Sequence, residues 1–288
     1  MTLFELVKIV LDRLYEEAVR EHGKETDGFI KERMKYLSST YATLSDPKRK
    51  PVNYKDPATR FAYVYTYVCA HGDFVVQVLE KLRDKLGGKI FTQKNVRASC
   101  IGGGPGSDII GMLKYLSENK KEPVEKLACY LLDREQAWSD TWAEIDDAMK
   151  VEIRLNTYFQ QLDVVEPDSW KSQQRFLDAD IFIMSYFVSE VRSLDAKGQV
   201  SKFWTTIFKR AKPGALFIYT DNGSDEFNDY FDELCKNAGL ENLVKQSNRK
   251  TFPRFTEQKS ELHEYTTKFE RSPRVSALLS YRALRKPK

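Results

Sequence analysis

The stretch CIGGGPGSDIIG, residues 100–111, decides the fold class. An apolar run leads into it from Val96, glycines fall at alternate positions (Gly102, Gly104 and Gly106), and a helix-forming segment leaves it. Because glycine has no Cβ, such a loop can turn sharply and bring its backbone close to a ligand. A helix that begins directly after the turn favours an anionic group at its N-terminus. The pattern predicts a strand, a ligand-holding loop and a helix; a tight turn without a ligand is the alternative.

From residue 96 onward, short apolar runs alternate with amphipathic stretches. Strands that are apolar on both faces and separated by helices are typical of a parallel sheet covered by helices on both sides. The expected strands are residues 96–102, 127–133, 151–155, 180–186 and 215–221. The expected helices between them are residues 108–117, 134–149, 193–210 and 224–238. In the tail, residues 263–269 and 276–284 flank turn residues, which predicts an antiparallel pair at the sheet edge.

The chain before the sheet has a different pattern. Apolar residues at steps of three and four predict helices, so residues 1–95 are expected to form a helical N-terminal extension and residues 96–288 the α/β domain. Residues 45–57 are polar and contain three prolines, which predicts a loop. Tyr63, Tyr67 and His71 share one helix face at steps of four. They are candidates for a lid or substrate region; a core-packing stripe is the alternative.

Composition excludes several functional classes. The chain has 288 residues, with 46 Lys and Arg against 42 Asp and Glu, and a net charge of +4 does not suit a protein held on nucleic acid by charge alone. No apolar run approaches the ~20 residues of a membrane span, and the N-terminus does not resemble a signal peptide. An intracellular protein, cytoplasmic or nuclear and without a membrane partner, is therefore expected. No metal site is expected, because there are three histidines and four widely spaced cysteines (Cys69, Cys100, Cys129 and Cys235).

Carboxylates follow the predicted strands near the glycine loop. Asp133, at the end of the second strand, can accept both hydroxyls of a ribose. It could instead be an N-cap for a helix that begins at Arg134. Asp163 follows the third strand and could meet an adenine edge, or could be a solvated loop acid. The fourth strand ends in Ser185 and should open onto the same crevice, since parallel strands present their carboxyl ends at one edge.

Together these residues resemble the class I S-adenosylmethionine-dependent methyltransferases over about residues 96–284. GGGPG at 102–106 is similar to the first motif of that family, Asp133 to the second and Leu162–Asp163 to the third, and Ser185–Tyr186–Phe187 stands at the fourth, acceptor-facing position. The resemblance implies a Rossmann-like three-layer sandwich with a mostly parallel seven-stranded sheet whose last strand is antiparallel. It also implies S-adenosyl-L-methionine as cofactor. The implied cofactor-binding residues are Gly102, Gly103, Gly104, Pro105, Gly106, Asp133, Arg134, Asp163 and Ser185.

A nicotinamide dinucleotide oxidoreductase shares the glycine turn and is the main rival. Its fingerprint has glycine or alanine three residues after the second glycine, where this chain has Ser107. The acid also comes 27 residues after Gly106, later than the ~20 residues expected of a dinucleotide-binding fold. Both departures favour the methyltransferase interpretation.

The catalytic group depends on the acceptor, because a sulfonium methyl donor carries most of the chemical drive and the protein mainly aligns a nucleophile. Polar residues at the ends of the fourth and fifth strands are the candidates: Ser185, Tyr186, Glu190, Asp221 and Asn222. Methyltransferases that act on the amino groups of bases or glutamine often have an acid or Asn before Pro-Pro-aromatic at this point. This chain has no proline there, which argues against such an acceptor.

Residues 184–224 loosely resemble the fungal uridine-N3 methyltransferases of large-subunit ribosomal RNA, with Glu190, Asp221, Gly223 and Ser224 as the counterparts. From residue 268 to 288 the tail has seven basic residues against one acid and could meet phosphates. An RNA base nitrogen is therefore the first expectation for the acceptor. A small molecule, a protein side chain and a non-catalytic cofactor-binding module remain the alternatives.

Overall fold

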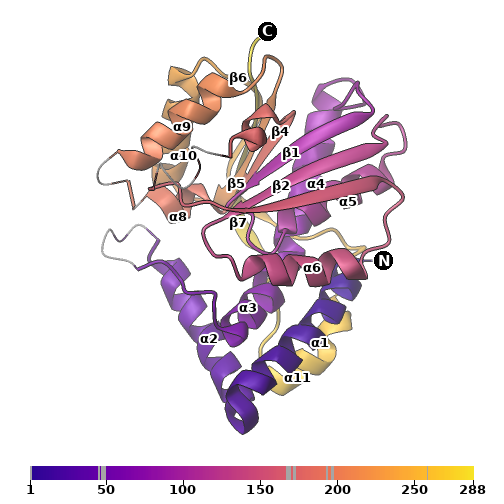
Figure 1. Ribbon diagram of the computed structural model, residues 1–288, viewed down its shortest axis with the longest axis vertical. Helices are drawn as coiled ribbons and strands as arrows, with labels where there is room; N and C mark the ends of the chain where they lie inside the picture. Colours follow the sequence, from indigo (N-terminus) through magenta and orange to yellow (C-terminus); the bar gives the residue numbers. More distant parts are fainter. Residues whose placement is uncertain are drawn as a thin grey trace.

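A seven-stranded sheet forms the centre of the computed structural model (Figure 1), in the order β3-β2-β1-β4-β5-β7-β6. The structure describes residues 2–44, 46, 50–166, 170, 173–192, 194–195, 198–257 and 259–288. Strand β7 is antiparallel to β5 and β6, and the other pairs are parallel. The strands are β1 (Asn95–Ile101), β2 (Lys126–Asp133), β3 (Arg154–Gln161), β4 (Ile181–Ser185), β5 (Leu216–Asn222), β6 (Glu241–Thr251) and β7 (Ala277–Arg285). The predicted fold class is confirmed, including the antiparallel last strand.

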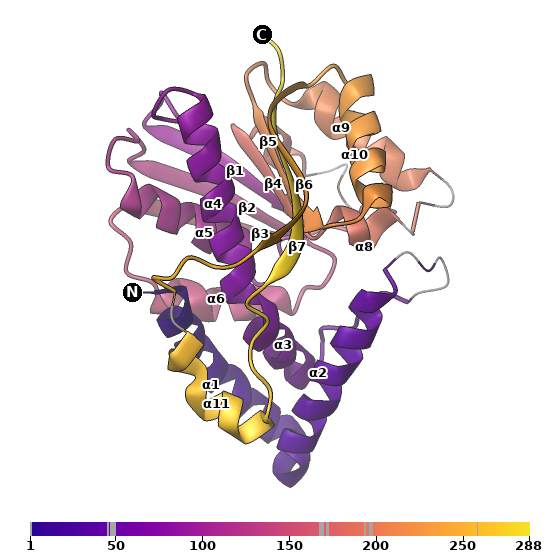
Figure 2. The same cartoon turned by 180° about the vertical axis from the view of Figure 1, so that it is seen from behind.

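Each face of the sheet is covered by helices (Figures 1 and 2). Successive side chains of β5 pack on opposite faces of the sheet: Leu216 and Ile218 belong to one apolar core, whereas Phe217 and Tyr219 belong to the other. This double burial explains why the central strands read as continuous apolar runs. The helices on one face are α4 (Cys69–Lys85), α5 (Ser107–Glu118) and α6 (Trp138–Ala148). Those on the other are α8 (Val188–Arg192), α9 (Gln199–Arg210) and α10 (Asp225–Asn237).

Helices α4 and α5 pack unusually closely. A Cβ added at Gly111 would lie 2.4 Å from the backbone carbonyl oxygen of Gly72. Gly111 must therefore be glycine for the two backbones to approach to this distance, whereas a Cβ at Gly72 would lie 3.2 Å from the Leu3 side chain. The contact ties the N-terminal extension directly to the helix that follows the glycine loop.

The N-terminal extension forms a helical layer at one end of the sheet (Figure 1). Its elements are α1 (Leu3–His22), a 3₁₀ turn (Gly23–Glu25), α2 (Thr26–Ala42), α3 (Pro57–Tyr63) and a π-helical turn (Val64–Val68) that runs into α4. Helix α11 (His263–Phe269), preceded by a 3₁₀ turn (Lys259–Leu262), lies alongside α1, and the Tyr265 hydroxyl donates to Asp12 at 2.5 Å. A chain segment from between β6 and β7 is therefore part of this layer.

The predicted antiparallel pair of residues 263–269 with 276–284 is wrong. Residues 263–269 form α11, and β7 pairs with β5 and β6 instead. The reason is the spacing of Tyr265 and Phe269, which at four residues places both rings on one helix face, against Phe61.

Two further boundaries differ from the prediction. The third strand was expected at residues 151–155, but β3 spans Arg154–Gln161, where its half-exposed edge position gives a polar pattern. The helix expected from residue 134 begins at Trp138, after a short 3₁₀-like turn. Another 3₁₀ turn spans Arg175–Asp178. Ser193, the expected start of the next helix, and residues 45 and 47–49 of the expected loop lie outside the described residues.

Within the described ranges, none of the helices combines the length and apolar character that crossing a bilayer requires. The same part of the chain holds no cluster of three His, Cys, Asp or Glu side chains that could bind a metal ion. The four cysteines are free and buried.

Candidate active site

The glycine loop joins β1 to α5 and needs glycine for its own conformation. Gly102, Gly104 and Gly106 have φ angles of +64°, +48° and +89°, which side-chain-bearing residues rarely adopt. A Cβ on Gly106 would also lie 2.2 Å from the Trp142 ring. Gly104 instead lines the crevice, where an added Cβ would make an ordinary contact with Trp138 at 3.7 Å, and it donates its N–H to Asp133 at 2.9 Å. The loop is thus both a tight turn and one wall of a crevice.

Asp133 holds this loop against the end of β2. Its carboxylate accepts the N–H groups of Gly104 and Glu135, both at 2.9 Å, and still lines the crevice. Enclosure raises the pKa of Asp133 to about 6, and the two N–H donors oppose that rise. Asp133 is not the N-cap of a helix, as one alternative predicted, because α6 begins at Trp138 with Ala137 as its N-cap. Its carboxylate instead holds the turn after β2 and borders the crevice.

The crevice lies at the carboxyl ends of β1, β2 and β4, and its water-accessible space is about 120 Å³. Seven of the predicted cofactor-binding residues line it: Gly102, Gly104, Pro105, Asp133, Arg134, Asp163 and Ser185. Gly103 and Gly106 do not line it. A Cβ on Gly103 would lie 2.4 Å from Leu131, so Gly103, like Gly106, serves close packing.

Three further aromatic rings complete the crevice, and two of them, Tyr54 and Trp138, were not predicted from the sequence. Tyr54, Trp138 and Phe187 line it, and the Tyr54 and Trp138 rings lie 4.7 Å apart. Trp138 stands in the first turn of the helix after Asp133, and this proximity was the one available sequence signal. Tyr54 comes from the loop between α2 and α3, more than 40 residues before the sheet begins.

Directly after β4 the backbone is strained at Tyr186, and the ring of this residue lies between the crevice and a second cavity. Tyr186 has φ +56°, an uncommon conformation for a bulky residue. Its N–H donates to the Thr220 carbonyl at 2.7 Å, which holds the turn in place. The Tyr186 ring stacks on His71 with centroids 3.8 Å apart and planes 15° apart. The Tyr186 ring therefore packs against His71 and also borders both cavities.

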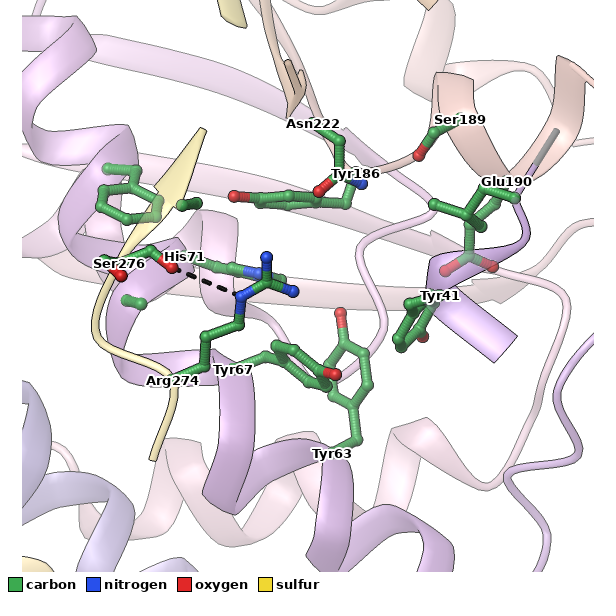
Figure 3. A pocket seen from close by; sticks show the side chains of 14 residues that line it. Tyr41, Tyr63, Tyr67, His71, Tyr186, Ser189, Glu190, Asn222, Arg274 and Ser276 are labelled. Atoms are coloured by element: carbon green, nitrogen blue, oxygen red, sulfur yellow. Dashed lines mark hydrogen bonds between the residues drawn. The ribbon is translucent and has the colours of Figure 1, made fainter. Parts of the chain in front are cut away.

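A second cavity, the aromatic pocket, adjoins the crevice (Figure 3). It is narrower than the crevice, with about 30 Å³ of water-accessible space, and shares Tyr63, Tyr186 and Glu190 with it. Its other walls come from distant parts of the chain and include Tyr41, Tyr67, His71, Phe74, Asn222 and Arg274. Because the two cavities share three residues, molecules bound in them would lie next to one another.

The predicted aromatic stripe divides between these cavities. Tyr63 lines both of them, whereas Tyr67 and His71 line only the aromatic pocket. The Tyr63 and Tyr67 rings lie 5.3 Å apart and the Tyr67 and His71 rings 5.6 Å apart, so the stripe also packs against itself. The π-helical turn at Val64–Val68 lies within this stripe. Such turns are frequent at functional sites.

Charge in the aromatic pocket is confined to few groups. Burial, assisted by the nearby Arg274, lowers the pKa of His71 to about 3, so the imidazole is neutral at neutral pH. Burial and then the Glu190 charge raise the pKa values of Tyr41 and Tyr63 far above the ordinary value, so both phenols stay protonated. Glu190 and Arg274 remain the charged side chains of the pocket lining.

Asp221 does not lie in either cavity, which departs from its prediction as a catalytic group. It is fully buried and accepts the N–H groups of Ser189 at 2.8 Å and Asn222 at 2.7 Å. Burial raises its pKa to about 6. Its carboxylate therefore fixes the start of α8, and so positions Glu190, while its neighbour Asn222 reaches the pocket.

Solved structures resemble this architecture. The chain aligns with the CurJ carbon methyltransferase at a TM-score of 0.52 and 11% identity, over 96% of this chain and 71% of that one. It aligns with an O-methyltransferase family protein from Burkholderia thailandensis at 0.50 and 12%, over 93% and 74%. A Listeria monocytogenes protein described as a class I S-adenosylmethionine-dependent methyltransferase aligns at 0.45 and 14%, over 100% and 82%. No family model matches the chain, and no curated protein matches its sequence.

The chain has the fold of the class I methyltransferases. At these identities the likeness concerns architecture alone. The two better-matching proteins are named for transfer to carbon and to oxygen, so the methyltransferase fold does not itself indicate an acceptor.

One buried acid near the crevice was missed by sequence reasoning. Asp108 is 1% exposed in the first turn of α5, and neither carboxylate oxygen makes a hydrogen bond of ordinary geometry with a described residue. Burial raises its pKa to about 7, and the adjacent Ser185 hydroxyl opposes the rise. The Ser185 hydroxyl is itself buried and lines the crevice. An acid directly after GGGPGS was the signal that could have drawn attention to it.

The basic tail is mostly engaged within this methyltransferase fold rather than free to meet phosphates. Arg282, for example, is 1% exposed and pairs with Asp232 at 2.7 Å. Other tail residues are held in the same way: Lys268 by Asp27, Arg271 by Ser38, Arg285 by Glu241, and Lys286 by the carbonyls of Phe208 and Lys209. Arg274 differs from them because it lines the aromatic pocket.

Proposed function

We propose that this protein is an S-adenosylmethionine-dependent methyltransferase whose acceptor enters the aromatic pocket. The observation that carries the proposal is the meeting of the two cavities at Tyr63, Tyr186 and Glu190. A transferase needs its two substrates side by side with the reacting atoms aligned. The class I fold supports the assignment of the crevice to the cofactor.

The residues of the crevice suit that cofactor. Gly104 lets the backbone of the loop border the crevice directly, and Asp133 would present a carboxylate to ribose hydroxyls. Asp163, after β3, would face the adenine edge. The Ser185 hydroxyl, buried and without an ordinary hydrogen bond to a described residue, would gain a polar partner.

Asp108 adds a charge of the right sign. The cofactor is cationic at its sulfonium and its amino group, and a carboxylate directly behind Ser185 favours a cation in the crevice. Its pKa of about 7 leaves Asp108 partly protonated near neutrality. We therefore assign Asp108 to electrostatic stabilisation of the bound cofactor, acting across Ser185.

The cofactor, when bound, supplies an electrophilic methyl group. The acceptor must lose one proton as its nitrogen or oxygen forms the new bond, and a base within reach assists that loss. Glu190 stands at the junction of the cavities and is the carboxylate placed to take the proton. Tyr186 and Ser185 border the same junction and would orient the acceptor, while Asp221 keeps α8 and hence Glu190 in position.

Calorimetry with S-adenosylmethionine and S-adenosylhomocysteine tests the crevice. We expect Asp133→Ala to weaken the binding of both by at least about tenfold, since a carboxylate that accepts two hydroxyls is lost. Asp140→Ala, an exposed acid of α6, is the matched control and should bind as the wild type does. Absence of binding to the wild type, or unchanged binding by Asp133→Ala, would contradict the proposal.

Transfer of tritium from methyl-labelled cofactor into fractionated cell extract tests catalysis. Label in the small-molecule fraction supports an acceptor that enters the aromatic pocket. Label in a nuclease-sensitive fraction would indicate that RNA is the acceptor, and label in protein would indicate a side-chain acceptor. Tight cofactor binding with no transfer into any fraction would identify a non-catalytic binding module.

A further inference from the structure

We infer that the acceptor is a compact, ring-containing anion whose negative group pairs with Arg274 in the aromatic pocket. This inference rests on the proposed function, because it names the substrate class of that same site. Three features of the pocket carry it: the placement of Arg274, the character of the walls, and the position of Glu190 at the opposite end.

Arg274 is held with its charge directed into the pocket. It lies in the segment between α11 and β7, where its N–H donates to the Thr66 carbonyl at 2.9 Å. Its Nε donates to the Ser276 carbonyl at 3.3 Å, and the guanidinium extends between Tyr67 and Tyr186 (Figure 3). The first bond holds the Arg274 backbone and the second its exposed side chain, with the two terminal nitrogens directed away from Ser276. That arrangement suits the bidentate recognition of an oxyanion.

The charge of Arg274 is not neutralised within the part of the chain that the structure describes, where it forms no ion pair with a carboxylate. Arg282 and Arg285, on the neighbouring strand, pair with Asp232 and Glu241. The field of Arg274 reaches the pocket walls, since it helps to lower the pKa of His71 and opposes the burial-driven rise in the pKa of Tyr67. A ligand with a negative group would supply the missing partner.

The walls favour a planar ring. Tyr67, Phe74 and Tyr186 present aromatic surface to the cavity, and the neutral His71 stacks beneath Tyr186. Aromatic side chains bind ring systems through offset or edge-to-face packing. The cavity is tight, since its water-accessible space is only about 30 Å³, and its walls must move apart to admit even one ring. The aromatic walls and this tightness together favour a ligand of one or two rings over a larger one.

Glu190 lies across the pocket from Arg274, on the side that the crevice shares (Figure 3). An acceptor anchored by its anion at Arg274 would point its other end at Glu190 and the bound cofactor. That end must then carry an amine or a hydroxyl with a proton to lose. The acceptor class is therefore an aromatic acid with an amino or hydroxyl group remote from the acid.

Binding of defined probes to the protein loaded with S-adenosylhomocysteine tests the pocket. The probes are 4-aminobenzoate and 4-hydroxybenzoate, phenyl phosphate as the phosphate arm, and the uncharged 4-aminobenzamide. We expect at least one anionic probe to bind about tenfold or more tightly than the amide, as expected for a charge-assisted bidentate contact. Tighter binding of the benzoates would indicate a carboxylate acceptor, and tighter binding of phenyl phosphate a phosphate acceptor. Equal binding of anions and amide, or no binding of any anion, would overturn the inference.

Arg274→Gln should abolish the preference for the anion, and Arg285→Gln, which breaks an exposed pair with Glu241 outside the pocket, should keep it. In the tritium experiment, the labelled product should be retained by an anion-exchange resin and should be lost with Arg274→Gln. A neutral or cationic product, or an unchanged yield with Arg274→Gln, would overturn the inference. Cofactor affinity is measured in the same variants: if the wild type does not bind cofactor, the proposed function fails, whereas intact cofactor binding without an Arg274 effect refutes this inference alone.

Discussion

At the scale of single residues, the proposed role of Asp108 in cofactor binding conflicts with its effect on the stability of the fold. A buried carboxylate without an ordinary hydrogen bond destabilises the fold when it is ionised, and its pKa of about 7 reflects that cost. The folded-state pKa exceeds the usual value, so the folded state holds the proton more tightly than the unfolded state does. The stability of the wild type should therefore fall as pH rises from about 4 to about 7 through this group.

Asp108→Asn should separate the two effects. Without a buried charge, we expect the variant to exceed the wild type in free energy of unfolding by about 1–2 kcal/mol at pH 8, and the difference to vanish below about pH 4. The same change should weaken the binding of S-adenosylmethionine more than that of S-adenosylhomocysteine, whose sulfur is uncharged. Calorimetry in buffers of different ionisation enthalpy should show proton release on cofactor binding by the wild type near pH 7, and none by the variant. A variant that is less stable and binds cofactor normally would assign Asp108 a packing role.

At the scale of elements, the short helix α8 depends on one carboxylate. Asp221 accepts the N–H of Ser189 from beneath the helix, so the position of Glu190 follows from that bond. Asp221→Ala leaves buried N–H groups without acceptors and should lower the free energy of unfolding by about 2–3 kcal/mol. We expect methyl transfer to fall by more than cofactor affinity does, since Asp221 lies outside the crevice. Asp221→Asn, which keeps one acceptor oxygen, should recover part of both losses; equal losses in affinity and transfer would contradict a positioning role.

The elements also show how far sequence reasoning reaches. The central strands are predictable because burial on both faces makes them apolar runs, and the glycine loop is predictable because its positive φ angles require glycine. Edge strand β3 is half-exposed, so its pattern is polar and its predicted position was shifted. The aromatic pocket contains residues from α2, β5 and the segment before β7. No local sequence pattern predicts that positions as distant as Tyr67 and Arg274 line the same pocket.

At the scale of the whole molecule, the segment between β6 and β7 fastens the N-terminal helices to the sheet domain. Arg254 pairs with the fully buried Asp73 of α4 at 2.7 Å and with Glu118 of α5 at 2.7 Å. Glu257, nearby, accepts the N–H of Leu3 at 2.7 Å and pairs with Lys114. These contacts bring the expected extension, the sheet domain and the crossover segment together in one place, beside the layer that carries Tyr63 and Tyr67.

If these contacts make one cooperative unit, removing Arg254 should destabilise the entire chain and not the N-terminal layer alone. Arg254→Ala leaves Asp73 as a buried charge without its partner, which should cost about 3–5 kcal/mol of unfolding free energy. Lys94→Ala, which breaks the exposed pair with Glu125, is the control and should change stability by less than about 1 kcal/mol. Circular dichroism of the whole fold and fluorescence of Trp138 should report a single transition at a lowered midpoint in Arg254→Ala. Two separated transitions would instead show that residues 1–95 unfold independently, and that the aromatic pocket can open while the cofactor crevice stays intact.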